Sequence, residues 1–349
     1  IGLISATLGI GGGVGLVIGG LLVDHASYHW IFWMAAAMSV AAAVAIELYV
    51  PESPVRTPGK VDFRGAAVLG VGLVLPMIAI ARANTWGWGA PKTLGLIAAG
   101  AAILVAWVQL ERKTEEPLTD VTALVAPPVL MTNIATLLVG FGMFGSFVLI
   151  PQLAESPEST GYGFGLSATS AGLLMLPAAL AMLVVGPVSG ILGARVGNKV
   201  PLALGGLITG TGLILMGLLH GSEIEILLFN TLSSIGIGLA YAAMPNLIVD
   251  AVPLHQTGQA TGFNAVIRSV GSSLGAQVTA AILAGGVLAS TGLPSDSGYT
   301  TAFLVSGIIA LAAAAAAAVI PRTSHGHLPV AAEIGAAGPL PDPAFATER

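Results

Sequence analysis

The stretch GIGGGVGLVIGG, residues 9–20, lies in a long apolar run near the start of the chain. A dinucleotide-binding loop needs glycines at i, i+2 and i+5 between a strand and a helix. Gly9 and Gly11 are followed by Val14 at the third position, and no Gly-Lys-Ser/Thr follows that would complete a P-loop. In a helix, small residues spaced by four align on one face, where a second helix can approach closely. Two such rows run side by side: Gly11, Gly15 and Gly19, and Ser5, Gly9 and Gly13. The stretch therefore predicts a packing helix, which we expect to lie against residues 167–192 around Gly186 and Gly190.

The composition indicates that this helix lies in a membrane. Of the 349 residues, 55% are apolar and 8% are charged, whereas soluble domains carry about 25% charged residues. The mean hydropathy is +0.91. A net charge of −5 without a basic run gives no sign of nucleic-acid binding, and the absence of cysteine excludes disulfides and thiolate chemistry. No catalytic set or cofactor motif is present in the sequence. We expect an all-α integral membrane protein that is not an enzyme.

Apolar runs long enough to cross a bilayer as a helix, about 20 residues, predict ten spans. They cover approximately residues 1–23, 30–50, 64–83, 92–110, 128–152, 167–192, 200–219, 225–249, 260–288 and 301–320. After them, residues 321–349 are rich in Pro, Gly and Ala without a periodic apolar face, which predicts a disordered tail.

Lysine and arginine residues collect on the cytoplasmic side of membrane proteins and so predict the orientation. Nine of the twelve follow even-numbered spans, among them Arg64 and Arg195. Only Arg82 and Lys92 fall in the opposite loops. The even spans and the C-terminal tail are therefore expected in the cytoplasm, and the first span runs outward. This orientation indicates an even number of spans upstream of Ile1.

Residues 11–20, GGGVGLVIGG, resemble the antiporter motif G-x-x-x-G-P-x-x-G-G of the major facilitator superfamily. The matching residues are Gly11, Gly15, Gly19 and Gly20. Leu16 stands where the family usually has proline. The motif marks the fifth helix of drug/proton antiporters. Segments 61–65, 84–91 and 111–120 resemble the entry to, the link between and the exit from two additional central helices. Their order is similar to that of the fourteen-helix drug/proton antiporter family, with about four helices missing from the N-terminal side.

A second segment, GILGARVGNK at 190–199, resembles a second-half copy of the superfamily's loop motif G-x-x-x-D-R-x-G-R-K. The matching residues are Gly190, Arg195, Gly197 and Lys199. Ala194 stands in place of the acid and Asn198 in place of an arginine. The segment is thus a weakened copy of the motif.

The resemblance implies a major facilitator fold fragment and a domain plan. Residues 1–50 would be the last two helices of the N-terminal bundle, 51–120 the two additional helices with their linkers, 121–320 the C-terminal six-helix bundle and 321–349 a cytoplasmic tail. The implied function is proton-coupled efflux of drug-like or other amphipathic small molecules by alternating access. The implied setting is a bacterial-type inner membrane, with protons and lipid as partners and without a cofactor. Because the family's first-helix acid would precede Ile1, we expect that this chain alone does not transport.

If the family arrangement holds, spans 128–152 and 225–249 line the central cavity. Methionine and aromatic side chains with a few amides suit large apolar substrates of varied shape. The candidate residues are Asn133, Met143, Phe144, Phe147, Tyr241 and Asn246. For each single residue, ordinary helix packing is the alternative.

Arg268 is the one charge well inside a predicted span, about 13 Å along the helix from Gln259 at 1.5 Å per residue. A cation at this depth must face protein or water. It could form a gate or coupling contact, with Asp250 or Glu47 as partner, or it could extend to the cytoplasmic surface and serve packing only.

Two other functions stay open on the sequence alone. One is a major facilitator carrier of a metabolite or lipid without drug specificity, and the other is a non-transporting membrane scaffold or receptor. His25 and His29 are spaced like a metal pair, but no third ligand accompanies them. No metal site is therefore predicted.

Overall fold

The computed structural model describes residues 2–51, 62–114, 118–253, 256–288 and 292–321. Within these ranges the chain forms eleven α-helices and one short 3-10 helix, η1 (Glu158–Thr160). The α-helices are α1 (Gly2–His25), α2 (His29–Tyr49), α3 (Phe63–Trp86), α4 (Pro91–Glu111), α5 (Val121–Val125), α6 (Pro127–Glu155), α7 (Ala168–Val196), α8 (Lys199–Leu218), α9 (Glu223–Ala251), α10 (Thr257–Gly285) and α11 (Asp296–Val319).

All ten predicted spans are helices, and α5 is the additional short one. In the described ranges nine helices are long and apolar enough to cross a membrane, and α1 is apolar over Gly11–His25. Large apolar side chains such as Trp33 and Val184 are 70% and 65% exposed, as a lipid-facing surface requires. The predicted all-α integral membrane fold is therefore confirmed. The predicted disordered tail, from 322 onward, lies outside the described residues.

Local sequence signals explain where several helices begin and end. Ser222 and Glu225 form a capping box at the start of α9, with each side chain bonding the other's backbone N–H at 3.3 and 3.0 Å. Asp62 caps α3 by accepting from the Gly65 amide at 2.8 Å. Gly197 ends α7 with φ of 89°, in the left-handed region that favours glycine. Pro151, in contrast, does not end its helix, because α6 continues to Glu155.

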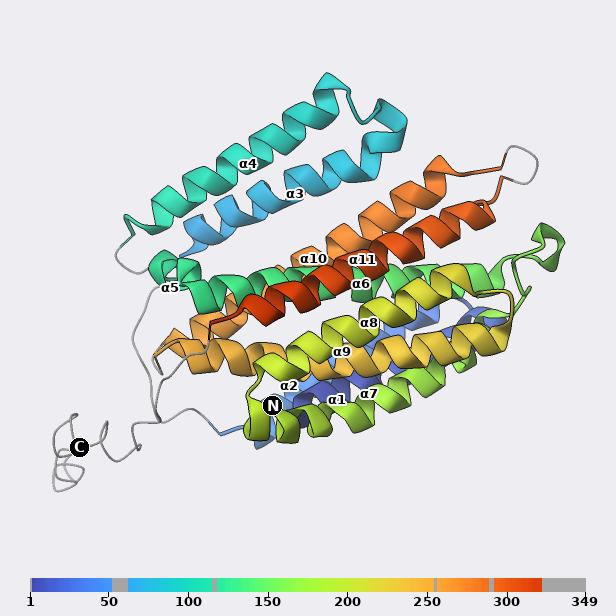
Figure 1. Ribbon diagram of the computed structural model, residues 1–349, viewed down its shortest axis with the longest axis horizontal. Coiled ribbons are helices and arrows are strands. Elements are labelled where there is room, and N and C mark those ends of the chain that lie inside the picture. Colours follow the sequence, from blue (N-terminus) through green and yellow to red (C-terminus); the bar gives the residue numbers. More distant parts are fainter. Residues whose placement is uncertain (1, 52–61, 115–117, 254–255, 289–291, 322–349) are drawn as a thin grey trace.

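Helices α6 to α11 form one bundle (Figure 1). α6 packs against α10 and α11, α8 packs against α9 and α11, and α7 packs against α9. Leu149, Leu213, Tyr299 and Phe303 are fully buried in its core. α8 and α11 approach so closely that a Cβ on Gly210 would lie 2.8 Å from the Gly307 carbonyl oxygen. Small residues thus set the spacing of this pair, as is common in membranes.

Helices α3 and α4 form a hairpin beside α10 (Figure 1). At one end the Asn84 side chain donates to the Ala281 carbonyl at 2.6 Å. At the other end the rings of Trp107 and Phe263 stack with centroids 6.0 Å apart and planes 4° apart. The hairpin is therefore attached to α10 at both of its ends.

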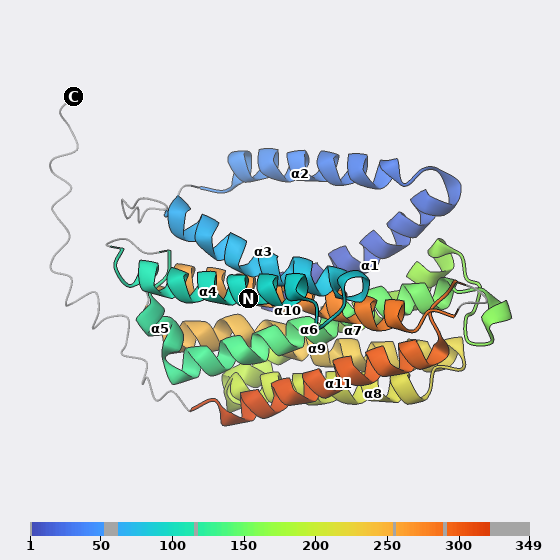
Figure 2. The ribbon, with the colours of Figure 1, turned by 90° about the horizontal axis from the view of Figure 1, so that it is seen from above.

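Helix α1 packs along α7, whereas α2 lies apart from the bundle (Figure 2). No residue of α2 is buried. A helix satisfies its own backbone hydrogen bonds and can present such an apolar surface to lipid or to further helices. Because α1 packs along the side of α7, it reaches the part of the bundle where α6, α7 and α9 surround one cavity.

Candidate substrate cavity

A cavity of about 410 Å³ lies between α1, α6, α7 and α9, close to the midpoints of α6, α7 and α9. Its wall is mostly apolar, and no charged residue contributes to it among the residues described. From α1 and α6 the wall takes Gly12, Gly13, Leu16, Met143, Phe144, Ser146, Phe147 and Val148. From α7 and α9 it takes Met175, Ala178, Ala179, Met182, Asn230, Ser234, Ile237 and Tyr241. The cavity is large enough for a drug-sized ligand.

Four of the six residues predicted for a substrate cavity line this one: Met143, Phe144, Phe147 and Tyr241. The rings of Phe144 and Phe147 lie 5.9 Å apart at an angle of 45°. Such a tilted pair offers both a ring face and a ring edge to a flat ligand.

The two remaining predicted residues lie elsewhere. Asn133 is buried between α6 and α10, where its side-chain oxygen accepts from Asn264 at 2.8 Å. Asn264 also donates to Thr136 at 2.9 Å, so these amides join two helices. Asn246 donates to the Ala242 carbonyl of its own helix at 3.1 Å. Neither amide is among the residues that line the cavity.

The sequence prediction missed the wall supplied by α7 and the polar positions on α9. Met175, Ala178 and Met182 follow each other at spacings of three and four on α7. On α9, Asn230, Ser234 and Tyr241 share one face in the same way. This helical spacing is the signal that selects them, since residues three and four apart point to the same side.

Arg268 on α10 is half-buried, and its guanidinium carbon lies 4.4 Å from the centroid of the Tyr241 ring. This distance is within the range of a cation–π interaction. Asp250, one of the two predicted acidic partners, instead accepts from the Asn198 side chain at 2.9 Å. The intramembrane charge thus lies against a residue of the cavity wall.

Gly13 and Gly20 of α1 are buried against α7. A Cβ on Gly20 would lie 2.5 Å from the Ala168 carbonyl oxygen. From the α7 side, a Cβ on Gly172 would lie 2.9 Å from the Leu16 carbonyl oxygen. Leu16, at the position of the motif's proline, therefore contacts α7 through its backbone.

Gly11, Gly15 and Gly19, the other three residues of the motif, have open space where a Cβ would be. Gly15 and Gly19 border a smaller cavity of about 180 Å³ between α1, α6 and α7. Contact with α7 was predicted around Gly186 and Gly190. Gly190 has no neighbour within 4 Å of a Cβ, and the close approaches described lie at residues 168–179.

The loop motif forms the turn between α7 and α8. Lys199 donates to the Ile320 carbonyl at 2.7 Å, which ties this turn to the end of α11. Asn198 ties it to the end of α9 through Asp250. Arg195 is exposed, and Gly190 lies one turn earlier in α7. The described contacts of this segment therefore hold helix ends together at the predicted cytoplasmic side.

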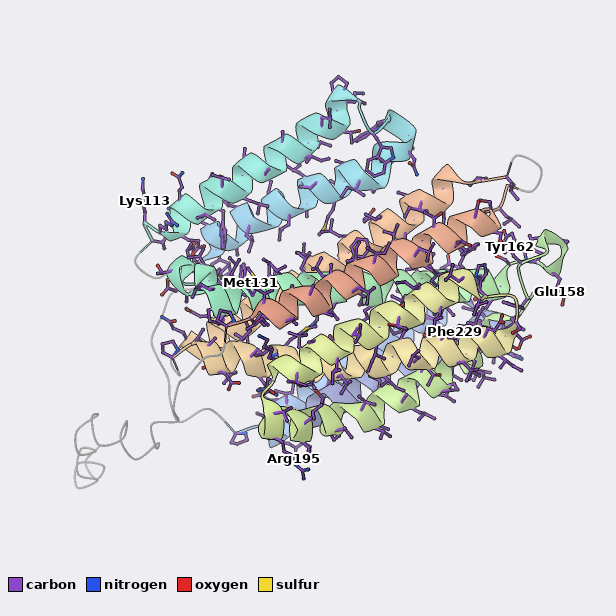
Figure 3. All side chains as sticks on the ribbon, in the orientation of Figure 1. Lys113, Met131, Glu158, Tyr162, Arg195 and Phe229 are labelled. Carbon is purple, nitrogen blue, oxygen red and sulfur yellow. The ribbon has the colours of Figure 1, made fainter. Side chains whose placement is uncertain are left out.

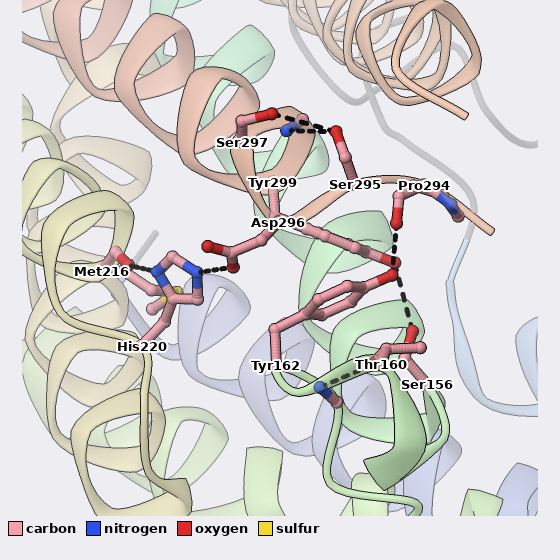
Figure 4. A network of polar contacts seen from close by, with 12 residues as sticks. Ser156, Thr160, Tyr162, Met216, His220, Pro294, Ser295, Asp296, Ser297 and Tyr299 are labelled. Carbon is pink, nitrogen blue, oxygen red and sulfur yellow. Dashed lines mark hydrogen bonds and ion pairs between the residues drawn. The ribbon is translucent and has the colours of Figure 1, made fainter. Parts of the chain in front are cut away.

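The opposite end of the bundle carries a polar network (Figure 4). His220 contacts the Met216 carbonyl through Nδ1 at 2.9 Å and Asp296 through Nε2 at 2.8 Å. Tyr162 donates to the Pro294 carbonyl. Burial raises the pKa of the Tyr162 phenol, so the group stays protonated and keeps this bond. The network joins the ends of α6 and α8 to the start of α11.

A cavity of about 660 Å³ lies beside this network and is lined in part by Glu158, Glu223, Glu225 and Asp296. Its open, acidic mouth lacks the apolar wall of the cavity at the helix midpoints. The two histidines considered for metal make local contacts: His25 with the Leu21 carbonyl, and His29 with Ser27. The midpoint cavity is therefore the stronger candidate for a substrate site.

Several known proteins are similar to this chain in sequence. The tetracenomycin C resistance and export protein of Streptomyces glaucescens is 28% identical over 288 residues, which cover 81% of this chain and 52% of that protein. Multidrug resistance protein Stp of Mycobacterium tuberculosis is 26% identical over 290 residues, 81% of this chain and 52% of that protein. The chain therefore spans about half the length of these two relatives.

Among solved structures, the nucleoside transporter NupG aligns with a TM-score of 0.47 and 14% identity over 91% of this chain and 82% of that one. This similarity is too distant to inform the cavity. The model of the Major Facilitator Superfamily matches residues 1–276 and again residues 132–345. Together these matches cover nearly the whole sequence, so the chain belongs to the Major Facilitator Superfamily, whose members are membrane transporters and not enzymes.

Proposed function

We propose that the protein exports amphipathic, drug-like small molecules by alternating access. The observation that carries this proposal is the cavity of about 410 Å³ with its methionine and aromatic wall. Methionine side chains adapt to ligands of different shape, and aromatic rings bind flat apolar surfaces. The names of the relatives, a tetracenomycin C resistance and export protein and a multidrug resistance protein, support the direction of transport.

Movement of α1 against α7 would open and close this cavity. Both helices line it, and glycines at their contact let the two backbones approach closely. At the end of this contact the Asp24 side chain accepts from the Thr169 amide at 2.8 Å, which holds the start of α7 to the end of α1. Separation of the two helices at that end would break this hydrogen bond.

Proton movement is the proposed driving force. Its support is the resemblance of residues 11–20 to the antiporter motif of drug/proton antiporters. The domain plan stated for the sequence is proposed with it: 1–50, 51–120, 121–320 and 321–349. The separate α3–α4 hairpin and the α6–α11 bundle fit this division.

The proposed location is a bacterial inner membrane with the C-terminal tail in the cytoplasm. The bacterial relatives support the first part. The positions of Arg64, Arg112, Arg195 and Lys199 at one end of the bundle support the second, because cytoplasmic loops collect positive charge.

Export is tested in bacteria that lack their main drug exporters and express the whole gene that encodes this chain, beside cells that express the 349 residues alone, which we expect not to transport. We expect the cells with the whole gene to retain less Nile red, an uncharged flat dye that suits a wall without charged residues, than cells with an empty vector. Replacing Phe144 and Tyr241 together by alanine should abolish most of the difference, because both rings line the cavity. Asn246→Ala is the matched control, since this residue lies outside the wall. Dye retention equal to that of the empty vector would favour a metabolite or lipid carrier.

Coupling is tested separately in everted vesicles from the same cells. Acidifying the vesicle lumen should drive Nile red uptake, and a protonophore should abolish it. Uptake that persists with the protonophore would keep the export proposal and reject proton coupling. A protein that moves no dye, metabolite or lipid under either condition would be a scaffold or receptor.

A further inference from the structure

Among the described residues, four polar side chains line the cavity: Ser146, Asn230, Ser234 and Tyr241. In all of them except Asn230, no buried polar atom lacks a hydrogen-bond partner. The Ser146 hydroxyl donates within its own helix, to the Met143 carbonyl at 2.7 Å. One face of the Tyr241 ring is covered by Arg268. Ser234 is 9% exposed and is not an unpartnered buried group. Asn230 differs from all three.

The Asn230 side chain is 5% exposed, and its Nδ2 is buried without a hydrogen-bond partner in the part of the chain that the structure describes. Asn230 lines the cavity together with Ser234 of its own helix and with Met175 and Met182 of α7. A buried amide donor left without a partner costs about 1–3 kcal/mol. An apolar side chain of similar size would avoid this cost, so the empty protein gains nothing from the amide.

Nδ2 is buried beneath the surface of the wall, so the amide must turn about its Cβ–Cγ bond before a ligand oxygen in the cavity can supply the missing partner. A carbonyl oxygen accepts from an amide N–H₂ and brings no charge into a wall whose described residues carry none. The rest of the wall consists of rings, thioethers and small aliphatic side chains, which bind a flat apolar body. Asn230 is therefore placed to distinguish ligands of the same shape by the presence of a carbonyl.

We propose that Asn230 is a specificity-determining residue whose amide donates to a carbonyl oxygen of neutral, flat, polycyclic ligands in the midpoint cavity. The proposal rests on the proposed function for its meaning in transport. Binding itself does not depend on transport and can be measured alone. A site built to bond a polar group rejects the analogue that lacks it, because the site's own polar group then stays unpaired.

Fluorene and 9-fluorenone form a matched pair of probes, since they differ only in a methylene or a carbonyl at one carbon. Equilibrium dialysis of each radiolabelled compound against the full chain in lipid nanodiscs, with empty nanodiscs subtracted, gives the two affinities. We expect fluorenone to bind about tenfold more tightly, the equivalent of one buried hydrogen bond. In Asn230→Leu the two compounds should bind equally, with the affinity for fluorene changed less than about twofold.

Asn246→Leu is the matched control, because it removes an amide from the same helix outside the wall. Asn230→Ser is a second variant that shortens the reach of the donor and should also lose the preference. Equal affinities in the unsubstituted protein, no binding of either probe, or a preference that survives in both Asn230 variants would overturn the proposal. A preference for fluorenone in a protein that exports no dye would keep this inference and reject the proposed function.

Discussion

The contact between Arg268 and Tyr241 links an intramembrane cation to the cavity wall. The guanidinium carbon lies 4.4 Å from the ring centroid. Such a pair contributes about 1 kcal/mol when partly desolvated. It also fixes the tilt of the ring, whose other parts border the cavity. Arg268 thus acts on the site through Tyr241 and does not line the cavity itself.

A double-mutant cycle tests this contact. Arg268→Ala and Tyr241→Leu should each lower the free energy of unfolding in detergent, and the double variant should fall short of their sum by about 1 kcal/mol. Tyr241→Phe should keep the coupling, because the ring and not the hydroxyl faces the cation. Effects that add fully, measured by denaturant titration of all four proteins, would show that the two side chains do not interact.

At the residue scale, the sequence predicted the types of cavity residue better than their faces. Met143, Phe144 and Phe147 line the midpoint cavity, and the sequence singled them out because the helix and the suitable side chains could both be identified. Asn133 has an equally suitable side chain but faces α10. In a helix that is apolar all round, no amphipathic pattern reveals which face meets which neighbour.

At the element scale, two glycines of α1 that match the same motif differ in their packing against α7. A Cβ on Gly20 would lie 2.5 Å from the Ala168 carbonyl oxygen and 2.8 Å from the Thr169 Cα, whereas a Cβ on Gly15 would enter open space. Only Gly20 of this pair therefore requires the absence of a side chain in the arrangement described.

Gly20→Val and Gly15→Val should accordingly differ. The first forces a branched side chain against α7 and should destabilise the protein by about 1–3 kcal/mol, as overpacking does. The second should change the stability little, because its side chain enters a small cavity. Thermal unfolding of both variants in the same detergent gives the comparison. Equal loss in the two variants, or a larger loss for Gly15→Val, would contradict this interface.

The transmembrane helices could be predicted because the thickness of the bilayer sets their minimum length. Ten apolar runs became ten helices, since a span needs about 20 apolar residues. α5 was missed because five residues carry no such signal. The predicted span 128–152 ends short of the helix, because α6 continues through Pro151 to Glu155, and a helix can pass a proline when its neighbours compensate for the lost hydrogen bond. The glycine rows predicted a packing helix, but the close approach to α7 is made by Gly13 of one row and by Gly20, whereas the row of Gly11, Gly15 and Gly19 has open space where a Cβ would be.

At the scale of the whole molecule, the charges divide between the two ends of the bundle. Lys113 and Arg195 lie toward one end, and Glu158 lies at the other (Figure 3). A single helix, α7, separates Glu158 from Arg195. Its 29 residues extend about 44 Å at 1.5 Å per residue, more than the roughly 30 Å of a hydrocarbon core. The two residues must therefore lie on opposite sides of the membrane.

The orientation can be measured directly, because the sequence contains no cysteine and a single introduced thiol has no background. Both Glu158 and Arg195 are exposed, so Glu158→Cys and Arg195→Cys should each react with a maleimide after denaturation. In intact cells a membrane-impermeant maleimide should label Glu158→Cys alone, since the positive end is expected in the cytoplasm. In everted vesicles it should label Arg195→Cys alone. The reverse pattern would place the C-terminal tail outside and contradict the proposed direction of export. Labelling of both variants from the same side would contradict α7 as a membrane span.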